Sequence, residues 1–220
     1  MSVLNGDPTD PTLYPAVFYF IAARNCTATL VASRTMVTAS HCLADNTPIF
    51  ARIPAGSKNW IPGDCYHAKA ESGPSPDFAV CILKGDAPGP FERINSKPDL
   101  IDPAKKPEVM IAGYGCGEDK EPKPPKPIFR TGLTNVVDYV EGALITKDRA
   151  ALCLGDSGGP TFLETKGGDR IQIGVGSQRV VDAKETSRLT PTSHPVAVAA
   201  VRQRSSQLIC GFDKHAHNCR

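Results

Sequence analysis

The sequence predicts an all-β protein, and three observations carry this prediction. Short apolar stretches alternate with Gly, Pro, Asp and Ser along the whole chain. Long stretches with the 3.6-residue period of an amphipathic helix are nearly absent. Proline makes up 20 of 220 residues, about 9% against a typical level near 5%, and proline breaks helix interiors and central strands. We therefore expect a sandwich or barrel and exclude a helical bundle.

Nine stretches are predicted as strands because each is short, largely apolar and bounded by turn-forming residues. The best helix candidate, Val201–Ile209, lies near the C-terminus, and two polar segments, Glu118–Pro127 and Val181–His194, are expected to be loops. The predicted strands, in chain order, are Ala16–Ala22, Thr27–Ala32, Arg34–Thr38, Phe78–Leu83, Glu108–Gly113, Ala143–Thr146, Gly159–Leu163, Arg170–Gly176 and Pro195–Val201.

Composition limits the class of protein. A hydrophobic share of 40% and a charged share of 22% suit a folded chain and exclude wholesale disorder. A net charge of +2 with both signs scattered gives no reason to expect nucleic acid or an anionic membrane as a partner. No apolar run approaches the roughly 20 residues that a membrane helix needs. A cluster of Pro and Asp within Ser96–Lys106 suggests a domain boundary near the middle of the chain.

The eight cysteines are an even number and contain no C-x-x-C spacing. This disfavours a structural zinc site and favours disulfides, which form in an oxidising compartment. We therefore expect a secreted or periplasmic protein. No signal peptide is visible, because Met1-Ser2 leads directly into Val3, so a targeting segment is expected to have been removed.

The motif that points most directly to chemistry is GDSGGP over residues 155–160. A serine hydroxyl is a poor nucleophile at neutral pH and needs an adjacent base. Glycines beside Ser157 let a carbonyl group approach and let the backbone aim two N–H groups at one point. The same string can also form a plain turn, so the base has to be found elsewhere.

A candidate base lies in VTASHC over residues 37–42, preceded by Leu30, Val31 and Cys26. His41 follows a predicted strand and neighbours Cys42, so a disulfide there would hold it rigidly. A lone histidine is usually structural, but these flanking residues favour catalysis.

With PDFAV over residues 76–80, these motifs resemble the chymotrypsin/trypsin family of serine endopeptidases and occur in that family's order. The resemblance implies two six-stranded antiparallel β-barrels with a short C-terminal helix. Residues 1–100 would form an N-terminal barrel with His41 and Asp77, and residues 101–220 a C-terminal barrel with Ser157, the helix and the tail.

Carried over by motif, His41 would be the general base, Ser157 the nucleophile and Asp77 the carboxylate that orients His41. Asp45, Asp64 and Asp86 are rivals to Asp77 but do not head an apolar strand. The amides of Gly155 and Ser157 would form the oxyanion hole. Ser177 resembles the serine that supports the aspartate, and Gln178, Arg179 and Val180 the edge that pairs with substrate backbone.

The same resemblance indicates the primary pocket. Ala151 stands at its base, followed by Leu152, so a buried Lys or Arg of the substrate would find no carboxylate. Arg179 and Val196 stand where glycines are usual, and they should make the pocket shallow. Cleavage after small apolar residues is expected. The alternative is that Arg179 folds inward and selects an acidic residue.

Val3-Leu4-Asn5-Gly6 resembles the new N-terminus that proteolytic activation creates in this family. Its free amine would pair with Asp156 and order the oxyanion hole, and Met1-Ser2 would block this pairing. The intact chain is therefore expected to be zymogen-like until Met1 and Ser2 are removed.

With the family's help, four disulfides are expected. Cys26–Cys42 would fix the His41 loop, Cys210–Cys219 the tail and Cys65–Cys81 the strands around Asp77. Cys116–Cys153 would border the pocket, although the family's usual partner for Cys153 lies in a loop that has no cysteine here.

The predicted function is thus a serine endopeptidase that works through an acyl-enzyme, with no metal and no cofactor. A polypeptide substrate is expected, with a protein inhibitor or an activating protease as further partners, and the chain should be a monomer. The alternatives are a catalytically silent binding protein or a locked zymogen on the same scaffold. An esterase of the α/β-hydrolase class is disfavoured, because its triad runs Ser, Asp, His along the chain.

Overall fold

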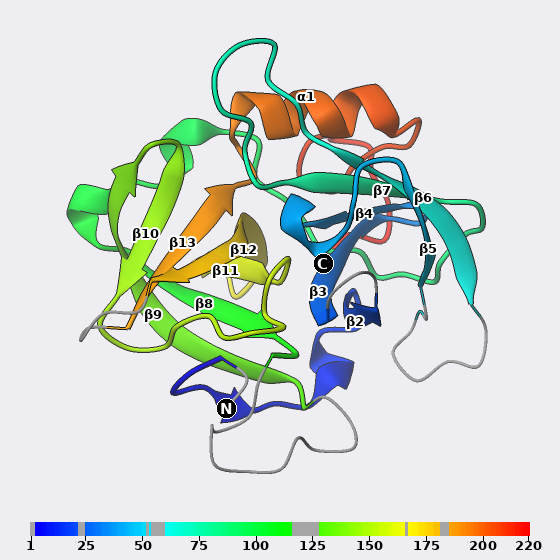
Figure 1. Cartoon of the computed structure of the whole chain (residues 1–220). Coiled ribbons are helices and arrows are strands. Elements are labelled where there is room, and N and C mark those ends of the chain that lie inside the picture. The colour runs from blue at the N-terminus through cyan, green and yellow to red at the C-terminus, as the bar shows by residue number, and fades with distance from the viewer. Residues whose placement is uncertain are drawn as a thin grey trace.

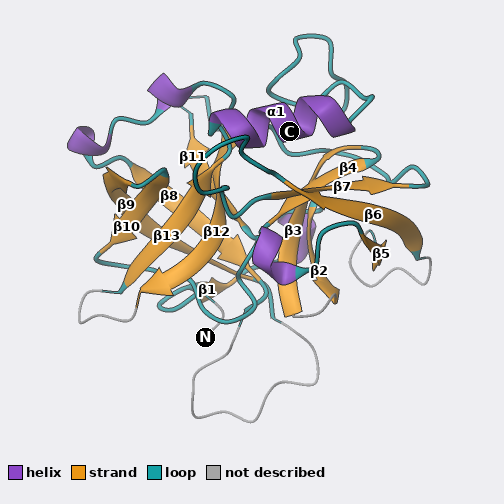
Figure 2. Cartoon of the chain, turned by 45° about the horizontal axis from the view of Figure 1, so that its top comes forward, coloured by secondary structure: helices purple, strands orange, loops and turns teal. Residues whose placement is uncertain are grey.

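The computed structural model describes residues 3–21, 25–51, 53, 60–115, 128–165, 167–180 and 185–220, without the side chains of residues 20, 21 and 25. Within these ranges two antiparallel β-sheets stand side by side, and a single α-helix lies across one end of the first sheet (Figure 1). Strands, short 3-10 helices and loops make up the rest of the described chain (Figure 2). The predicted all-β class with a short C-terminal helix is confirmed.

The first sheet has six strands in the order β2-β3-β4-β7-β6-β5 and curls into a half-barrel. The central strands β4 and β7 bury nearly every side chain. Burial therefore favours one register for the pairing of these strands. The strands of this sheet are β2 (Val17–Ile21), β3 (Asn25–Ala32), β4 (Thr35–Thr38), β5 (Thr47–Ala51), β6 (Ile61–His67) and β7 (Ala79–Leu83).

The second sheet closes into a six-stranded barrel, because β8 pairs with both β9 and β11. The short strand β1 (Asp7–Pro8) adds to its outside by pairing with β9. Its other strands are β8 (Glu108–Gly113), β9 (Arg130–Val140), β10 (Ala143–Lys147), β11 (Pro160–Glu164), β12 (Arg170–Val180) and β13 (Thr186–Pro191).

The first sheet takes its strands from residues 1–100 and the second from residues 101–220, except that β1 of the second sheet comes from the first half. The boundary near residue 100 stays a prediction. Connections carry four 3-10 helices: η1 (Pro11–Leu13), η2 (Ser40–Cys42), η3 (Pro98–Leu100) and η4 (Pro103–Lys105). No helix within the described ranges is long and apolar enough to cross a membrane.

The C-terminal helix α1 spans Pro195–Arg204, so the predicted strand Pro195–Val201 is wrong and the predicted helix Val201–Ile209 starts too late. Pro195 occupies the first turn, where its missing N–H is no loss, and the His194 side chain accepts the Val196 N–H at 3.3 Å as a cap. These two features start a helix where the alternation of valine and alanine suggested a strand. Ala197 and Val201 then pack into the core of the first sheet.

The predicted loop Val181–His194 is also corrected, because residues 186–191 form β13. Strand β13 pairs along its length with β12 and β10. Its Thr and Ser side chains are buried, which hid it from a hydrophobic pattern. The other predicted loop, Glu118–Pro127, falls within the undescribed stretch 116–127.

Strands β9 and β10 are joined by a tight two-residue turn. Glu141 and Gly142 both have positive φ, at 50° and 78°, and lie between the paired residues Val140 and Ala143. A turn with two positive φ angles matches the twist of a hairpin. The surface beside β13 at this end of the barrel is therefore bordered by a hairpin tip and not by a long loop.

Candidate active site

Asp77, just before β7, accepts five hydrogen bonds from four residues. The His41 ring nitrogen Nδ1 lies 2.7 Å from Asp77 Oδ2, and the His41 backbone N–H donates to Oδ1 at 2.9 Å. Ser177 Oγ donates to Oδ2 at 2.6 Å, and Ser40 Oγ to Oδ1 at 2.8 Å. Thr190 Oγ1 donates to the Asp77 carbonyl oxygen at 3.0 Å. These contacts hold one carboxylate between η2 and the second barrel.

The electrostatics favour an ionised Asp77. Burial by itself would raise the pKa of Asp77, but the hydrogen bonds from His41 and Ser177 and the charge of His41 outweigh it and lower the pKa to about 2. A carboxylate that stays charged at Nδ1 of His41 leaves the other ring nitrogen, Nε2, able to accept a proton.

The three rival carboxylates have other partners. Asp45 forms an ion pair with Lys69 and accepts the His67 N–H at 2.9 Å. Asp64 pairs with Lys84 at 3.1 Å, and Asp86 accepts the Ser33 hydroxyl at 2.8 Å. Within the described residues, Asp77 is the carboxylate that contacts His41.

Ser157 belongs to the turn between Ala151 and β11, which is anchored on the first sheet. The Thr27 backbone N–H donates to the Ser157 carbonyl at 2.8 Å, and Thr27 Oγ1 donates to the Gly155 carbonyl at 2.9 Å. Thr27 neighbours Cys26, whose sulfur lies within 4.8 Å of a His41 ring nitrogen. The two halves of the chain therefore bring Ser157 and His41 to one place, although the described contacts include no hydrogen bond between their side chains.

Glycine is required on both sides of Ser157. Gly155 has φ +100° and Gly158 φ +80°, which favour glycine strongly. A Cβ on Gly155 would lie 2.8 Å from the Cα of Gly115. In the hydrogen bonds described for this chain, the amides of Gly155 and Ser157 donate to no protein acceptor. Two backbone N–H groups without a protein acceptor, at Gly155 and at Ser157 itself, can donate hydrogen bonds to a substrate oxyanion.

Asp156 is fully buried and accepts three backbone N–H groups. Val3 and Cys153 donate to Oδ2 at 2.7 and 2.9 Å, and Gly115 donates to Oδ1 at 2.8 Å. Burial raises the pKa of Asp156 to about 6, against the opposing effect of these hydrogen bonds. Leu4 and Ala151 exchange two backbone hydrogen bonds, so the segment from Val3 onward is fixed against the base of the predicted pocket.

The predicted pocket residues come together with one exception. Ala151 and Leu152 are buried, and Leu152 donates its N–H to Ser187 Oγ at 2.9 Å. Ser187 pairs across the sheet with Arg179, so these two side chains share a face. Val196 is placed elsewhere: it lies in α1 and packs against the core of the first sheet. The residue opposite Arg179 is therefore Ser187.

Sequence reasoning missed three polar residues of this region: Ser40, Ser187 and Thr190. Ser40 directly precedes His41 and could have been suspected from that position. Ser187 and Thr190 lie on β13, which has no glycine or charged motif that would mark it.

Three of the four expected disulfides are confirmed: Cys26–Cys42, Cys65–Cys81 and Cys210–Cys219. Cys153 is also disulfide-bonded. Cys116 lies outside the described residues, so its pairing with Cys153 stays a prediction.

One group of metal-ligating side chains gathers among the described residues: Cys26, His41 and Cys42. The two cysteines are bonded to each other, so they offer no thiolate to a metal ion. This cluster is therefore a disulfide beside His41, and we assign no metal site to it.

Comparison with known proteins agrees with the fold. The family model for trypsin matches residues 3–199. A solved structure of HL collagenase superimposes with a TM-score of 0.70 over 93% of this chain and 100% of its own, at 16% sequence identity, which shows a shared fold. No curated protein matches the sequence. The resemblance of the motifs is confirmed by these findings: the chain belongs to the trypsin family of serine proteases and has its chymotrypsin-like fold.

Proposed function

We propose that this protein is a serine endopeptidase in which Ser157, His41 and Asp77 form the catalytic triad. The observation that carries the proposal is the 2.7 Å contact between His41 Nδ1 and Asp77 Oδ2, in the same region where Thr27 anchors the Ser157 turn. Catalytic hydrogen bonds in free enzymes are often long and tighten when substrate binds.

The proposed reaction proceeds through an ester of Ser157. Ser157 Oγ forms a bond to the carbonyl carbon while His41 Nε2 takes its proton, and the oxyanion lies between the amides of Gly155 and Ser157. The C–N bond then breaks as His41 passes this proton to the leaving amine. Water, deprotonated by His41, hydrolyses the ester and restores Ser157. Asp77 stabilises the imidazolium in both steps.

Activation is proposed to require a free amine on Val3. The Val3 nitrogen already lies 2.7 Å from the buried Asp156 carboxylate, but with Ser2 attached it is an uncharged amide. Attachment of Ser2 also gives Val3 a φ of 46°, which a β-branched residue rarely adopts. Removal of Met1 and Ser2 would replace the amide with an ammonium group and abolish this strain, which favours a zymogen-like intact chain.

The proposed primary specificity is for small apolar residues. Ala151 and Leu152 would provide no charge at the base of the pocket, and Arg179, which pairs with Ser187 across the sheet, would narrow it. A second candidate is an acidic preference through Arg179. Among the described residues its buried Nε has no hydrogen-bond partner, and its guanidinium donates to Glu185 at 3.4 Å. Kinetics on peptides that differ only in this residue separate the two.

The three described disulfides support a proposed location outside the cytoplasm, secreted or periplasmic. Polypeptides are the proposed substrates, with a protein inhibitor or an activating protease as possible partners of a monomer. A silent binding protein or a permanently locked zymogen is the competing proposal, and a probe of the serine decides between them.

The test is labelling with a fluorophosphonate, which modifies only an activated serine. We expect protein whose first residue is Val3 to be labelled at Ser157, and both Ser157→Ala and His41→Ala to abolish labelling. Ser193→Ala is the matched control and should label normally. Protein that retains Met1 and Ser2 should label far more slowly. Equal labelling of both forms would refute the activation step, and absence of labelling in every form would refute the peptidase.

A further inference from the structure

We propose that Arg188 gives the substrate cleft a preference for an acidic side chain at the second or fourth residue before the cleaved bond. This inference rests on the proposed peptidase function and goes beyond the pocket for the residue at the cleaved bond.

Strand β12 has a free edge where it passes the reaction centre. Its partner β11 ends at the pair Pro160–Val175, whereas β12 continues to Val180 and pairs there only with β13 among the described strands. A free edge offers backbone N–H and C=O groups to an extended peptide. Residues 177–180 can therefore bind substrate as an added strand.

The register assigns each substrate side chain to a face. A bulge lies between Gly176 and Gln178, after which Arg179 pairs with Ser187 and Gln178 pairs with Arg188. Ser187 is fully buried and contacts Leu152, so the Arg179 face is the pocket face. Because side chains alternate, a substrate residue that enters the pocket places the second and fourth residues before the cleaved bond on the face of Gln178 and Arg188.

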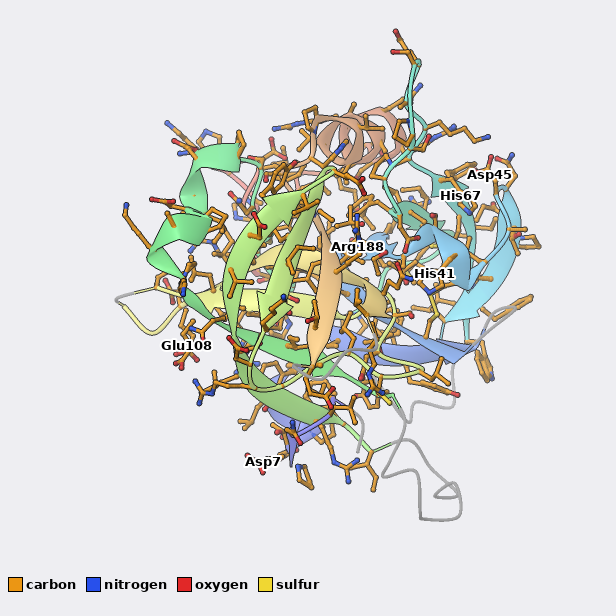
Figure 3. All side chains as sticks on the ribbon, turned by 60° about the vertical axis from the view of Figure 1, so that its left-hand side comes forward. Asp7, His41, Asp45, His67, Glu108 and Arg188 are labelled. Atoms are coloured by element: carbon orange, nitrogen blue, oxygen red, sulfur yellow. A yellow bond between two sulfur atoms is a disulfide. The ribbon has the colours of Figure 1, made fainter. Side chains whose placement is uncertain are left out.

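This second face lies beside the proposed triad. The bulge turns Ser177 onto Asp77, and Thr190, two residues beyond Arg188 on β13, donates to the Asp77 carbonyl oxygen. In the view of Figure 3, Arg188 lies on the side of the second sheet that is nearer to His41. Adjacent strands are about 4.8 Å apart, so a long acidic side chain on the substrate strand can meet the guanidinium across Gln178.

The Arg188 guanidinium is available for such a contact. Its side chain is 29% exposed, and its ion pair with Glu141 is a single contact of 3.4 Å to a carboxylate that is 79% exposed. Such a pair is worth little and is easily exchanged for another carboxylate. Asp138, on the neighbouring part of β9, accepts the Tyr139 N–H. On the β10 side of Arg188, the described chain turns back within two residues, Glu141 and Gly142.

The experiment uses protein that spans Val3 to Arg220. The substrates are internally quenched peptides that differ only in having Glu, Gln or Lys at the second or the fourth residue before the cleaved bond. For the native protein we expect Glu to exceed Gln in kcat/KM by about three- to tenfold at one of these positions, less at high salt. Arg188→Gln should bring the ratio to about one, and Arg188→Glu should favour Lys. Glu141→Gln should increase the preference for Glu, because it removes the competing carboxylate.

Arg93→Gln is the matched control. Arg93 also forms an ion pair with one carboxylate, Asp169, at 3.7 Å, and its carbonyl oxygen accepts the N–H of Gln172 on β12. This variant should retain the native ratio. An equal Glu-to-Gln ratio in the native protein and Arg188→Gln would overturn the inference while leaving the peptidase intact. Failure of every peptide to be cleaved, with no labelling of Ser157, would overturn the proposed function as well.

Discussion

Asp156 combines complete burial with a pKa that burial raises to about 6 when Val3 is an amide. The folded chain then binds a proton more tightly than the unfolded chain, whose Asp has a pKa near 3.8. The stabilising contribution is complete below pH 3.8 and is lost as the pH rises through 6. An ammonium group at Val3 would instead lower the pKa of Asp156, because a positive charge favours the charged carboxylate.

We therefore predict that the chain with Met1 and Ser2 loses about 3 kcal/mol of stability between pH 4 and pH 7 through this one group. Asp156→Asn should remove that part of the pH dependence, measured by urea unfolding across this range. Protein that begins at Val3 should lack the loss. The same slope in all three proteins would contradict this account of Asp156.

Gly158 and Gly168 form a matched pair at the residue scale. Their φ angles are nearly identical, +80° and +81°, but a Cβ on Gly158 would lie 2.0 Å from Thr38 Oγ1, whereas a Cβ on Gly168 meets nothing within 4 Å. Both alanine variants strain the backbone equally.

Gly168→Ala should thus cost about 1 kcal/mol of stability and leave labelling of Ser157 unchanged. Gly158→Ala should cost several times more and abolish labelling, because the Ser157 turn must move away from β4. Calorimetry and the fluorophosphonate probe measure the two effects. Similar losses for both variants would show that contact with Thr38 is unimportant.

At the scale of elements, two disulfides act on different parts of the first sheet. Cys26–Cys42 ties β3 to η2, which carries His41, whereas Cys65–Cys81 joins β6 to β7. Both have a sequence separation of 16, so the entropy removed from the unfolded chain is about the same, about 3 kcal/mol each.

Replacing either pair with serines should accordingly lower stability to a similar degree. Activity should respond differently: loss of Cys26–Cys42 should lower kcat strongly, because His41 would no longer be held against Asp77, while loss of Cys65–Cys81 should leave kcat nearly unchanged at low temperature. Peptide hydrolysis below the unfolding transition gives the comparison. Equal effects on kcat would mean that the disulfide beside His41 serves stability alone.

The elements also show what a local sequence pattern can and cannot predict. His41, Asp77 and Ser157 lie in short contiguous motifs whose meaning does not depend on the exact strand register. Val196 failed because its placement required the register of a strand that is in fact a helix, capped by His194. Ser187 and Thr190 were missed because β13 buries hydroxyl side chains, which a pattern of apolar residues cannot reveal. The curl of the first sheet into a half-barrel depends on contacts between distant residues and leaves no local signal.

For the whole molecule, the C-terminal segment completes the core of the N-terminal sheet. Ala197, Val201 and Ile209 pack in the same cluster as Phe18 and Leu30. Backbone bonds join Cys210 to Val31 and Arg220 to Phe91. The two halves of the sequence therefore share one hydrophobic cluster.

It follows that residues 1–100 should remain unfolded when made alone, because their apolar face would be exposed to water. Fusing residues 195–220 to this fragment should restore dispersed amide signals in an NMR spectrum. A stable fold of residues 1–100 without the C-terminal segment would contradict the shared core.

The seating of Val3 against Asp156 has a practical consequence for producing this protein. An affinity tag or leader fused upstream of Val3, however flexible, would leave a neutral linkage at the point where the proposed activation requires a positive charge. Recombinant preparations for activity assays should therefore be designed so that a processing enzyme leaves valine as the first residue, and an assay on tagged material would test only the zymogen-like form that we propose.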